Sequence, residues 1–402
     1  MDQQSSTESA AKFVRDRVTW LSYLMIATYC YAAAALGPLM TFLRAELQLN
    51  YTISALHFGF WSGGIATAGI TGDRCMKRFG RRNTVWIATL FLCLGLFVLI
   101  GGRHPAVTIA GAYLCGLSGS TMAQTMSTIL SDRYLALRAV AITESTIVAS
   151  ICCSLSPVAI AFFSKTELGW RTAMLVPPLA FLVYFLTMRS TLSDLHLAEA
   201  ESKSKQEPES RLPKEYWLCW SLVYFSVAGE WSIMFWTAEY LESVINLPRA
   251  DAAACVTSFL FAMVVGRIIG SRLARRVNAV ILLRVASLAA IFGFIMFWSS
   301  KVVLICLLGL FITGLGVSNF YPLTLAQAVA SAPGKTSQAT SRMSLASGGA
   351  TLTAPLLLGL IAEKFGILSA YGLIALLMIL CSIIVFLPVW TQKRQSLESL
   401  PE

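Results

Sequence analysis

Residues 53–102 read ISALHFGFWSGGIATAGITGDRCMKRFGRRNTVWIATLFLCLGLFVLIGG. Two apolar runs, 53–75 and 84–102, flank a short connector that holds four basic residues. Each run has about 20 residues, which is long enough for a helix to cross a hydrocarbon core of ~30 Å at a rise of 1.5 Å per residue. The stretch therefore predicts two membrane helices joined by a short basic turn.

The same pattern continues along the whole chain of 402 residues. Hydrophobic residues make up 56% of it and charged residues 13%, with a mean hydropathy of +0.68, whereas soluble domains carry about 25% charged residues. A soluble fold would leave large apolar patches exposed, so we predict an all-α membrane protein with twelve transmembrane helices. The predicted spans are approximately 20–43, 53–75, 84–102, 106–130, 138–163, 170–189, 215–241, 252–273, 279–299, 302–329, 340–362 and 367–389.

One connector is much longer and more polar than the others. Residues 198–211 read AEAESKSKQEPESR, a composition typical of a solvated linker. The first nineteen residues lack the apolar core of a cleavable signal peptide. We therefore predict a cytoplasmic tail (1–19), a six-helix bundle (20–189), a cytoplasmic linker (190–214), a second six-helix bundle (215–389) and a cytoplasmic tail (390–402).

The basic residues indicate the orientation of the chain. With both termini inside, the inner segments hold 22 of the 31 Lys and Arg residues and the outer connectors hold 7. This excess favours cytoplasmic termini, as expected of a multi-pass protein of the plasma membrane, in bacteria the inner membrane. The net charge is +10, and the Lys and Arg residues that produce it lie in short loops between apolar runs. This distribution indicates the orientation of the chain in the membrane and does not favour nucleic acid binding.

The two predicted bundles carry related signatures. Residues 73–82 (DRCMKRFGRR) close the second span, and residues 266–276 (GRIIGSRLARR) close the eighth, which is the second span of its own half. Ser156-Pro157 in the fifth span corresponds to Ala354-Pro355 in the eleventh. Two parallel six-helix repeats are the arrangement of major facilitator transporters.

At these residues the chain resembles the major facilitator superfamily over essentially its whole length. The loop between that family's second and third helices follows the pattern G-x-L-x-D-R-x-G-R-R. Asp73 stands here where the first Gly belongs, and Lys77 stands where the family has Asp. Asp73 lies one helical turn earlier and could pair with the basic cluster instead. The resemblance implies a gating loop formed by Asp73, Lys77, Arg78, Gly80, Arg81 and Arg82.

Short motifs in the second half point to a branch of the family. Residues 229–233 (GEWSI), 314–322 (GLGVSNFYP) and 347–359 are similar to fucose permease-type sugar symporters. Ala112 stands where drug/proton antiporters have Arg. The resemblance thus favours metabolite transport over multidrug export.

Few charged residues fall inside the predicted spans, where each costs about 2.5–3.5 kcal/mol on insertion scales. Glu230 lies in span seven beside Trp231 and Trp236, whose flat faces could stack on a planar solute. We predict that Glu230 binds substrate or takes up and releases a proton. The alternative is a carboxyl group that only fixes helix packing.

Glu144 and Arg267 are further candidates for substrate or proton binding, each with a structural alternative. Glu144 lies near the inner end of span five, where it could equally pair with Arg138 or the basic loops. Arg267 in span eight is expected to hold helix ends in one conformation. If it faces the transport path instead, an anionic solute becomes plausible, because guanidinium binds carboxylate bidentately.

Neutral polar residues could line the path, although hydrogen bonding between helices explains each of them as well. His57 lies near the outer end of span two, close enough to the interface to be solvated. Five glycines are expected to permit close helix approach: Gly63, Gly64 and Gly69 in span two, and Gly348 and Gly349 in span eleven. The path candidates are Gln124, Asn319, Tyr29, Tyr31 and His57.

These features predict a secondary active transporter of a small polar metabolite, a sugar or an organic acid, working by alternating access and coupled to protons. Its partners would be the substrate, the coupling ion and the lipid bilayer, and one chain would suffice. Alternatives are an exporter of drugs or amphipathic compounds, an uncoupled uniporter, or a channel, sensor or membrane enzyme. The sequence shows no nucleotide-binding loop, catalytic set, cofactor motif or metal cluster, so we expect neither an enzyme nor a bound cofactor.

Overall fold

The computed structural model describes residues 14–134, 137–191, 212–274, 276–332 and 335–387. Most of the predicted linker 190–214, the tail 390–402 and the first thirteen residues of the tail 1–19 lie outside the described residues.

All regular elements in these ranges are helices, and they follow the apolar runs of the sequence. In the first part of the chain they are α1 (Arg17–Leu47), α2 (Tyr51–Gly101), α3 (Pro105–Arg133), α4 (Arg138–Ser164), the short 3₁₀ helix η2 (Trp170–Leu175) and α5 (Val176–Met188). In the second part they are α6 (Lys214–Ser243), α7 (Arg249–Leu273), α8 (Ala279–Ser299), α9 (Val303–Val317), α10 (Phe320–Ser331), α11 (Thr336–Phe365), α12 (Ile367–Ala370) and α13 (Gly372–Phe386).

Within the described residues, eleven helices are long and apolar enough to cross a membrane. One of them, α2, has 51 residues and would be about 76 Å long if straight, more than twice the hydrocarbon core. Gly80 interrupts it with φ 75° and ψ 157°, a conformation that only glycine adopts without strain. Because α2 therefore crosses twice, the predicted twelve spans are confirmed. The tenth span is built from two helices, α9 and α10.

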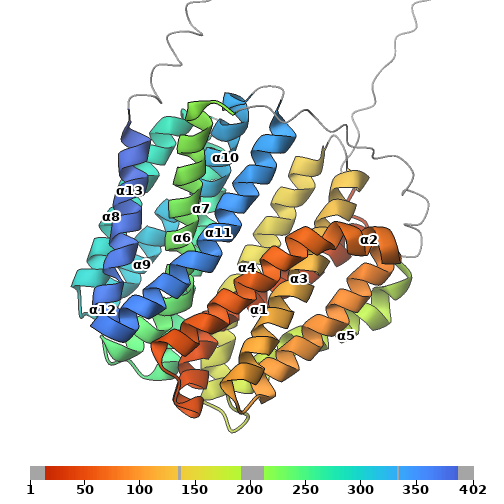
Figure 1. Cartoon of the computed structure of the whole chain (residues 1–402), viewed down its shortest axis with the longest axis horizontal. Helices are drawn as coiled ribbons and strands as arrows, with labels where there is room; N and C mark the ends of the chain where they lie inside the picture. Colours follow the sequence, from red (N-terminus) through yellow and green to blue (C-terminus); the bar gives the residue numbers. More distant parts are fainter. Residues whose placement is uncertain (1–13, 135–136, 192–211, 275, 333–334, 388–402) are drawn as a thin grey trace, which may run out of the picture.

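The helices form two groups that lie side by side (Figure 1). The first half contains α1 to α5 and the second half α6 to α13. Between the halves, α1 contacts α6 and α7, α2 contacts α11, and α4 contacts α7. These pairs form the seam of the molecule.

The two ends of the bundle differ in how the halves meet. We call the end that contains the start of α1, the Gly80 bend and the start of α4 the kink face. The opposite end, with the end of α1, the start of α2 and the end of α6, is called the latch face. At the kink face, Arg81 pairs with Asp132 at 2.5 Å, and both residues belong to the first half.

At the latch face, ion pairs join the two halves. Arg44 of α1 pairs with Glu239 of α6, and Lys165 pairs with Asp251 at 2.6 Å. The carboxylate of Glu363 at the end of α11 accepts hydrogen bonds from the first two N–H groups of α2, at 2.7 and 3.2 Å. A carboxylate at a helix N-terminus is electrostatically favourable, so this contact also holds the halves together.

Tight packing continues from the latch face into the seam. The rings of Phe58 and Phe235 stack with centroids 4.4 Å apart. Gly37 of α1 lies directly against the backbone of α6, with no room for a side chain. The structure therefore shows two halves that are packed together and closed at the latch face.

Candidate functional site

Glu230 and Arg267 lie together in the middle of the second half. Glu230 lies in the middle of α6 and Arg267 in the last third of α7, and Arg267 Nη2 is 4.0 Å from Glu230 Oε1. Although both residues belong to membrane-length helices, 21% of the Glu230 side chain and 32% of the Arg267 side chain are exposed. The structure thus brings together two charged residues that the sequence had singled out separately.

Arg267 reaches across the seam to the first half. Its Nη1 donates a hydrogen bond to Ser150 Oγ of α4 at 2.5 Å, and the Ser150 hydroxyl donates to the Thr146 carbonyl at 2.7 Å. The pair therefore faces the other half of the molecule, where the transport path of a two-bundle carrier is expected.

Two cysteines lie close to the Glu230–Arg267 pair. The thiol of Cys153 in α4 donates to the carbonyl oxygen of Cys30 in α1 at 3.3 Å. Both side chains lie within electrostatic reach of Arg267. The site is therefore lined by α1, α4, α6 and α7, the same helices that meet along the seam.

Asn319 holds the backbone that carries Arg267. Its Nδ2 donates to the carbonyl oxygen of Gly266 at 2.8 Å, one residue before Arg267. Gly270 lies directly against the Asn319 side chain, with no room for a Cβ atom. The Asn319 side chain therefore packs against α7 and is used in contacts between helices.

Glu144 lies at the kink face, about 9 Å along α4 from Ser150 by helical rise. Its carboxylate accepts two hydrogen bonds from Arg15, at 2.8 and 2.6 Å, and one from the Tyr23 hydroxyl at 3.3 Å. The pairing partner is therefore Arg15 rather than Arg138. The contact ties the segment before α1 to the start of α4.

The two tryptophans beside Glu230 have different surroundings. Trp236 is buried, its edge packs on Phe58 with ring centroids 5.2 Å apart, and its Nε1 donates to the Pro355 carbonyl at 3.1 Å. Trp231 is partly buried and packs edge-on against Phe235. In this state Trp236 therefore belongs to the closed seam.

Three of the remaining path candidates pack inside the first half. His57 is fully buried and hydrogen-bonds Ile53 and Thr108, so of its two alternatives the structure shows hydrogen bonding between helices and not solvation. Tyr31 donates to the Ala173 carbonyl at 3.0 Å. Tyr29 stacks on Trp61. The neighbouring helices leave no polar group of His57 facing a path.

The predictions for Gln124 and for the closely packed glycines are met only in part. Gln124 is partly buried and donates to the Ser120 hydroxyl at 3.0 Å. Gly64 does allow close approach, because a Cβ there would collide with the backbone of Tyr113 and Leu117. A Cβ at Gly63, Gly69 or Gly348 would meet no atom within 4 Å, and one at Gly349 would make only an ordinary contact with Tyr224 at 3.6 Å. The expectation of close packing is therefore wrong for these four.

The residues of the predicted gating loop lie at the Gly80 bend. Asp73 does pair with Lys77, at 2.6 Å and one turn apart, but both side chains are exposed. Arg81 bonds Asp132 at the end of α3, and the Arg78 guanidinium lies over the ring of Phe79. Arg82 is partly buried. The loop therefore ties α2 to α3 within the first half.

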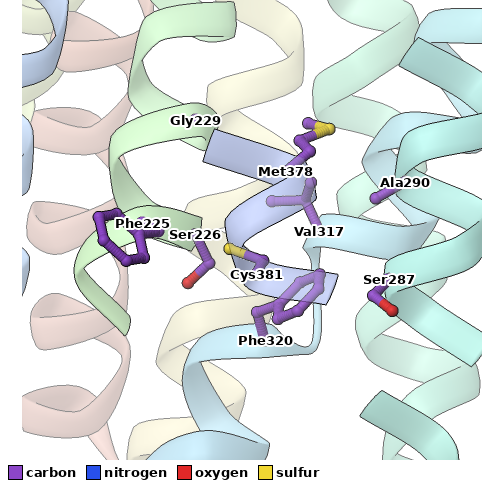
Figure 2. A pocket seen from close by; sticks show the side chains of 9 residues that line it. All are labelled: Phe225, Ser226, Gly229, Ser287, Ala290, Val317, Phe320, Met378 and Cys381. Atoms are coloured by element: carbon purple, nitrogen blue, oxygen red, sulfur yellow. The ribbon is translucent and has the colours of Figure 1, made fainter. Parts of the chain in front are cut away.

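A small cavity lies inside the second half, between α6, α8, α9, α10 and α13 (Figure 2). Its walls are mostly apolar, and only about 10 Å³ of it is open to the centre of a water molecule, which is about enough for one water. Gly229 in its wall precedes Glu230. The cavity is too small for a metabolite and is separate from the seam.

Sequence reasoning missed Ser150, Cys30 and Cys153. A signal for Ser150 exists, because Thr146, Ser150 and Ser154 repeat every four residues and so form a hydroxyl stripe along one face of α4. The two cysteines gave no signal, since small soft residues are common in membrane helix packing.

Comparisons with known proteins agree with this architecture. An uncharacterised MFS-type transporter of Yersinia pestis is 22% identical over 357 residues, 86% of this chain and 89% of that protein. The uncharacterised transporter y4wD of Sinorhizobium fredii is 27% identical over 135 residues, 34% of this chain, and the match covers only 36% of that relative.

Solved structures show the same fold at low sequence identity. A bacterial homologue of the lysosomal transporter Spinster, in an inward-facing and unoccupied conformation, matches with a TM-score of 0.70 and 12% identity over 94% of this chain and 97% of its own. A D-xylose–proton symporter matches with a TM-score of 0.69 and 11% identity over 92% and 96%. The nucleoside transporter NupG matches with 0.70 and 12% over 96% and 100%.

The family itself follows from the sequence. The family model described as Major Facilitator Superfamily matches residues 22–300 and 220–402, which together cover nearly the whole chain. With its twelve membrane crossings in two halves and its charged pair at the seam, the chain belongs to the major facilitator superfamily of membrane transporters.

Proposed function

We propose that this protein is a proton-coupled secondary transporter that moves a small polar metabolite by alternating access. The observation that carries the proposal is the Glu230–Arg267 pair, which is partly exposed within two membrane-length helices and faces the seam. Charged residues inside a membrane protein are costly and mark substrate or ion pathways.

The contacts between the halves support alternating access. The halves are joined at the latch face by Arg44–Glu239 and Lys165–Asp251, while the ion pairs Arg15–Glu144 and Arg81–Asp132 at the kink face lie within the first half. Rocking of the two halves would break the first set and leave the second intact. The bundles 20–189 and 215–389 would be the moving bodies, connected by the linker 190–214.

We assign the kink face to the cytoplasm. The excess of Lys and Arg in the segments on that side favours cytoplasmic termini, in the plasma membrane or, in bacteria, the inner membrane. One chain contributes both Ser150 of the first half and Glu230 of the second to the site, so a monomer suffices for transport.

Glu230 is the best candidate for the proton carrier. Its carboxylate faces the cation Arg267, so gain or loss of a proton changes the charge of the site as a whole. Among the solved structures with this fold is a D-xylose–proton symporter, which supports coupling of a small polar solute to protons.

The test starts with a thermal-shift screen of sugars, carboxylates and amino acids against the purified protein. The compound that stabilises the protein is then followed into proteoliposomes with an imposed proton gradient. We expect Glu230→Gln to abolish accumulation and retain exchange of labelled for unlabelled compound. Glu215→Gln, the same change at an exposed position of α6, should accumulate normally. Undiminished accumulation by Glu230→Gln would contradict proton coupling at this residue.

A second candidate function is export of amphipathic compounds. An apolar groove of about 770 Å³ runs between the second part of α2 and α5, lined by residues such as Trp86, Phe97 and Leu179. Such a groove could accept an apolar tail. Growth inhibition by a panel of toxic amphipathic compounds, measured with and without the protein, separates the two functions, because only an exporter protects the cells.

A further inference from the structure

Arg267 has more hydrogen-bond donors than partners. A guanidinium group has five N–H donors. In the described part of the chain, one of them bonds Ser150 Oγ at 2.5 Å, and the nearest carboxylate oxygen, on Glu230, is 4.0 Å from Nη2. That distance is too long for a hydrogen bond. The planar fork of Arg267 is thus largely unused by the protein.

The fork is also accessible. The Arg267 side chain is 32% exposed and its neighbour Glu230 is 21% exposed, so a solute at the seam can reach both. The position of the fork is fixed, because Asn319 bonds the carbonyl oxygen of the residue before Arg267 and Ser150 bonds one of its nitrogens. A planar guanidinium group that is fixed in position and has free N–H donors matches the geometry of a carboxylate better than that of any neutral group.

We propose that the transported solute is a small organic carboxylate whose carboxylate group is held by Arg267, rather than a neutral sugar. This rests on the proposed transport function and names its substrate class. The hydroxyl oxygen of Ser150 in the first half accepts a hydrogen bond from the Arg267 guanidinium of the second half, so an anion bound by Arg267 lies where the two halves meet. A ligand bound at that contact can couple its own binding to the movement of the halves.

The charge of the site explains how such an anion would be linked to the coupling proton. With Glu230 ionised, the carboxylate of Glu230 and the carboxylate of the solute compete for one guanidinium. With Glu230 neutral, Arg267 is left as an uncompensated positive charge and attracts the solute. Among the described residues, the other titratable side chains in electrostatic reach of Arg267 are the thiols of Cys30 and Cys153. Proton and anion therefore bind cooperatively, each raising the affinity for the other.

The experiment compares matched pairs of labelled compounds in proteoliposomes: lactate with lactamide, gluconate with glucose, and benzoate with benzamide. We expect protein-dependent flux in the carboxylate members only. Arg267→Gln and Arg267→Lys should each lower that flux about tenfold or more, because charged bidentate hydrogen bonds are lost. Arg272→Gln, at an exposed position of the same helix, should stay within about twofold of the wild type.

A second measurement needs no variant. Alkylation of Cys153 by N-ethylmaleimide, followed by mass spectrometry of its peptide, reports occupancy beside Arg267. The transported carboxylate should slow alkylation of the wild-type protein, and its neutral counterpart should leave the rate unchanged.

The outcomes distinguish the inference from the function on which it rests. Flux of a neutral compound equal to that of its carboxylate partner, carboxylate flux unchanged in Arg267→Gln, or equal protection of Cys153 by both would overturn the carboxylate inference and leave the transporter standing. If neither the carboxylates nor their neutral counterparts show protein-dependent flux, the proposed function is overturned together with the inference.

Discussion

Asp16 fastens the start of α1 in two ways. One carboxylate oxygen accepts hydrogen bonds from the Thr19 N–H at 2.9 Å and the Thr19 hydroxyl at 2.7 Å, and the other binds Arg133 at the end of α3. Burial alone would raise the pKa of the Asp16 carboxyl group, but these hydrogen bonds and the nearby guanidinium together lower it below its usual range. The ionised form of Asp16 therefore stabilises the folded protein.

This pKa shift gives a prediction about acid stability. Because the folded-state pKa is lowered, the contribution of Asp16 is fully present above the unfolded pKa of about 3.9 and is lost as the pH falls through the folded value. Asp16→Ala removes a helix cap, which costs about 1 kcal/mol. The wild type should unfold at a higher temperature than this variant at pH 7, and the gap should narrow below about pH 4.

Thermal unfolding in detergent at pH 7 and pH 3 measures both gaps. Asp73→Ala serves as control, since its ion pair with Lys77 is largely exposed and exposed pairs contribute little. A gap for Asp16→Ala that is equally large at both pH values would show that the ionised carboxylate is not what holds α1.

Single residues also show which features of the candidate site can be predicted from the sequence. Glu230 and Arg267 were predictable as candidates because charge is scarce inside the spans. That they meet was not predictable. They lie on different helices, and an apolar membrane helix carries little sequence information about its rotation, since lipid and helix neighbours are both apolar. The same lack of rotational information explains why the burial of His57 was not predictable.

Among the elements, α1 and α6 approach each other closely across the seam. A Cβ atom on Gly37 would lie 2.5 Å from the Met234 carbonyl oxygen and 2.8 Å from the Phe235 Cα atom. We predict that Gly37→Val forces the halves apart near the latch face, because overpacking a tight contact costs about 1–3 kcal/mol. Transport should fall about tenfold, measured as initial uptake in proteoliposomes.

The matched control is Gly63→Val. The same side chain is added to a helix of the first half, but at a position where a Cβ meets no atom within 4 Å. Its transport rate should stay within about twofold of the wild type. Equal loss in both variants would attribute the effect to valine in a membrane helix rather than to the contact between α1 and α6.

The elements themselves were the most predictable part of the molecule. Span length is set by the thickness of the bilayer, so runs such as 279–299 coincide with α8. The interruptions were not predictable from hydropathy. The tenth span divides into α9 and α10 around Asn319, and the sixth starts as the 3₁₀ helix η2 before α5. These breaks depend on packing against neighbours, which composition alone does not encode.

For the whole molecule, the equilibrium between a closed and an open latch face depends on the ion pairs that join the two halves there, Arg44–Glu239 and Lys165–Asp251. Glu239 is the most buried of their members, with 8% of its side chain exposed, and it is the partner of Arg44 and of the Ser243 hydroxyl. Hydrogen bonds to charged groups contribute about 1.5–3 kcal/mol. Loss of such a contact shifts a two-state equilibrium roughly tenfold to a hundredfold.

We therefore predict that Glu239→Gln opens the latch face in a larger fraction of molecules. Cys153 at the seam reports the change, because a membrane-impermeant thiol reagent added on the latch side reaches it only when the latch face opens. Its alkylation, measured by mass spectrometry of the Cys153 peptide, should be about tenfold faster than in the wild type. Glu46→Gln is the control, since Glu46 bonds Arg103 and Arg171 within the first half and should leave the rate unchanged. Equal rates in all three proteins would mean that the Arg44–Glu239 pair does not hold the halves together, and closure would then depend on the packing of Phe58 and Phe235.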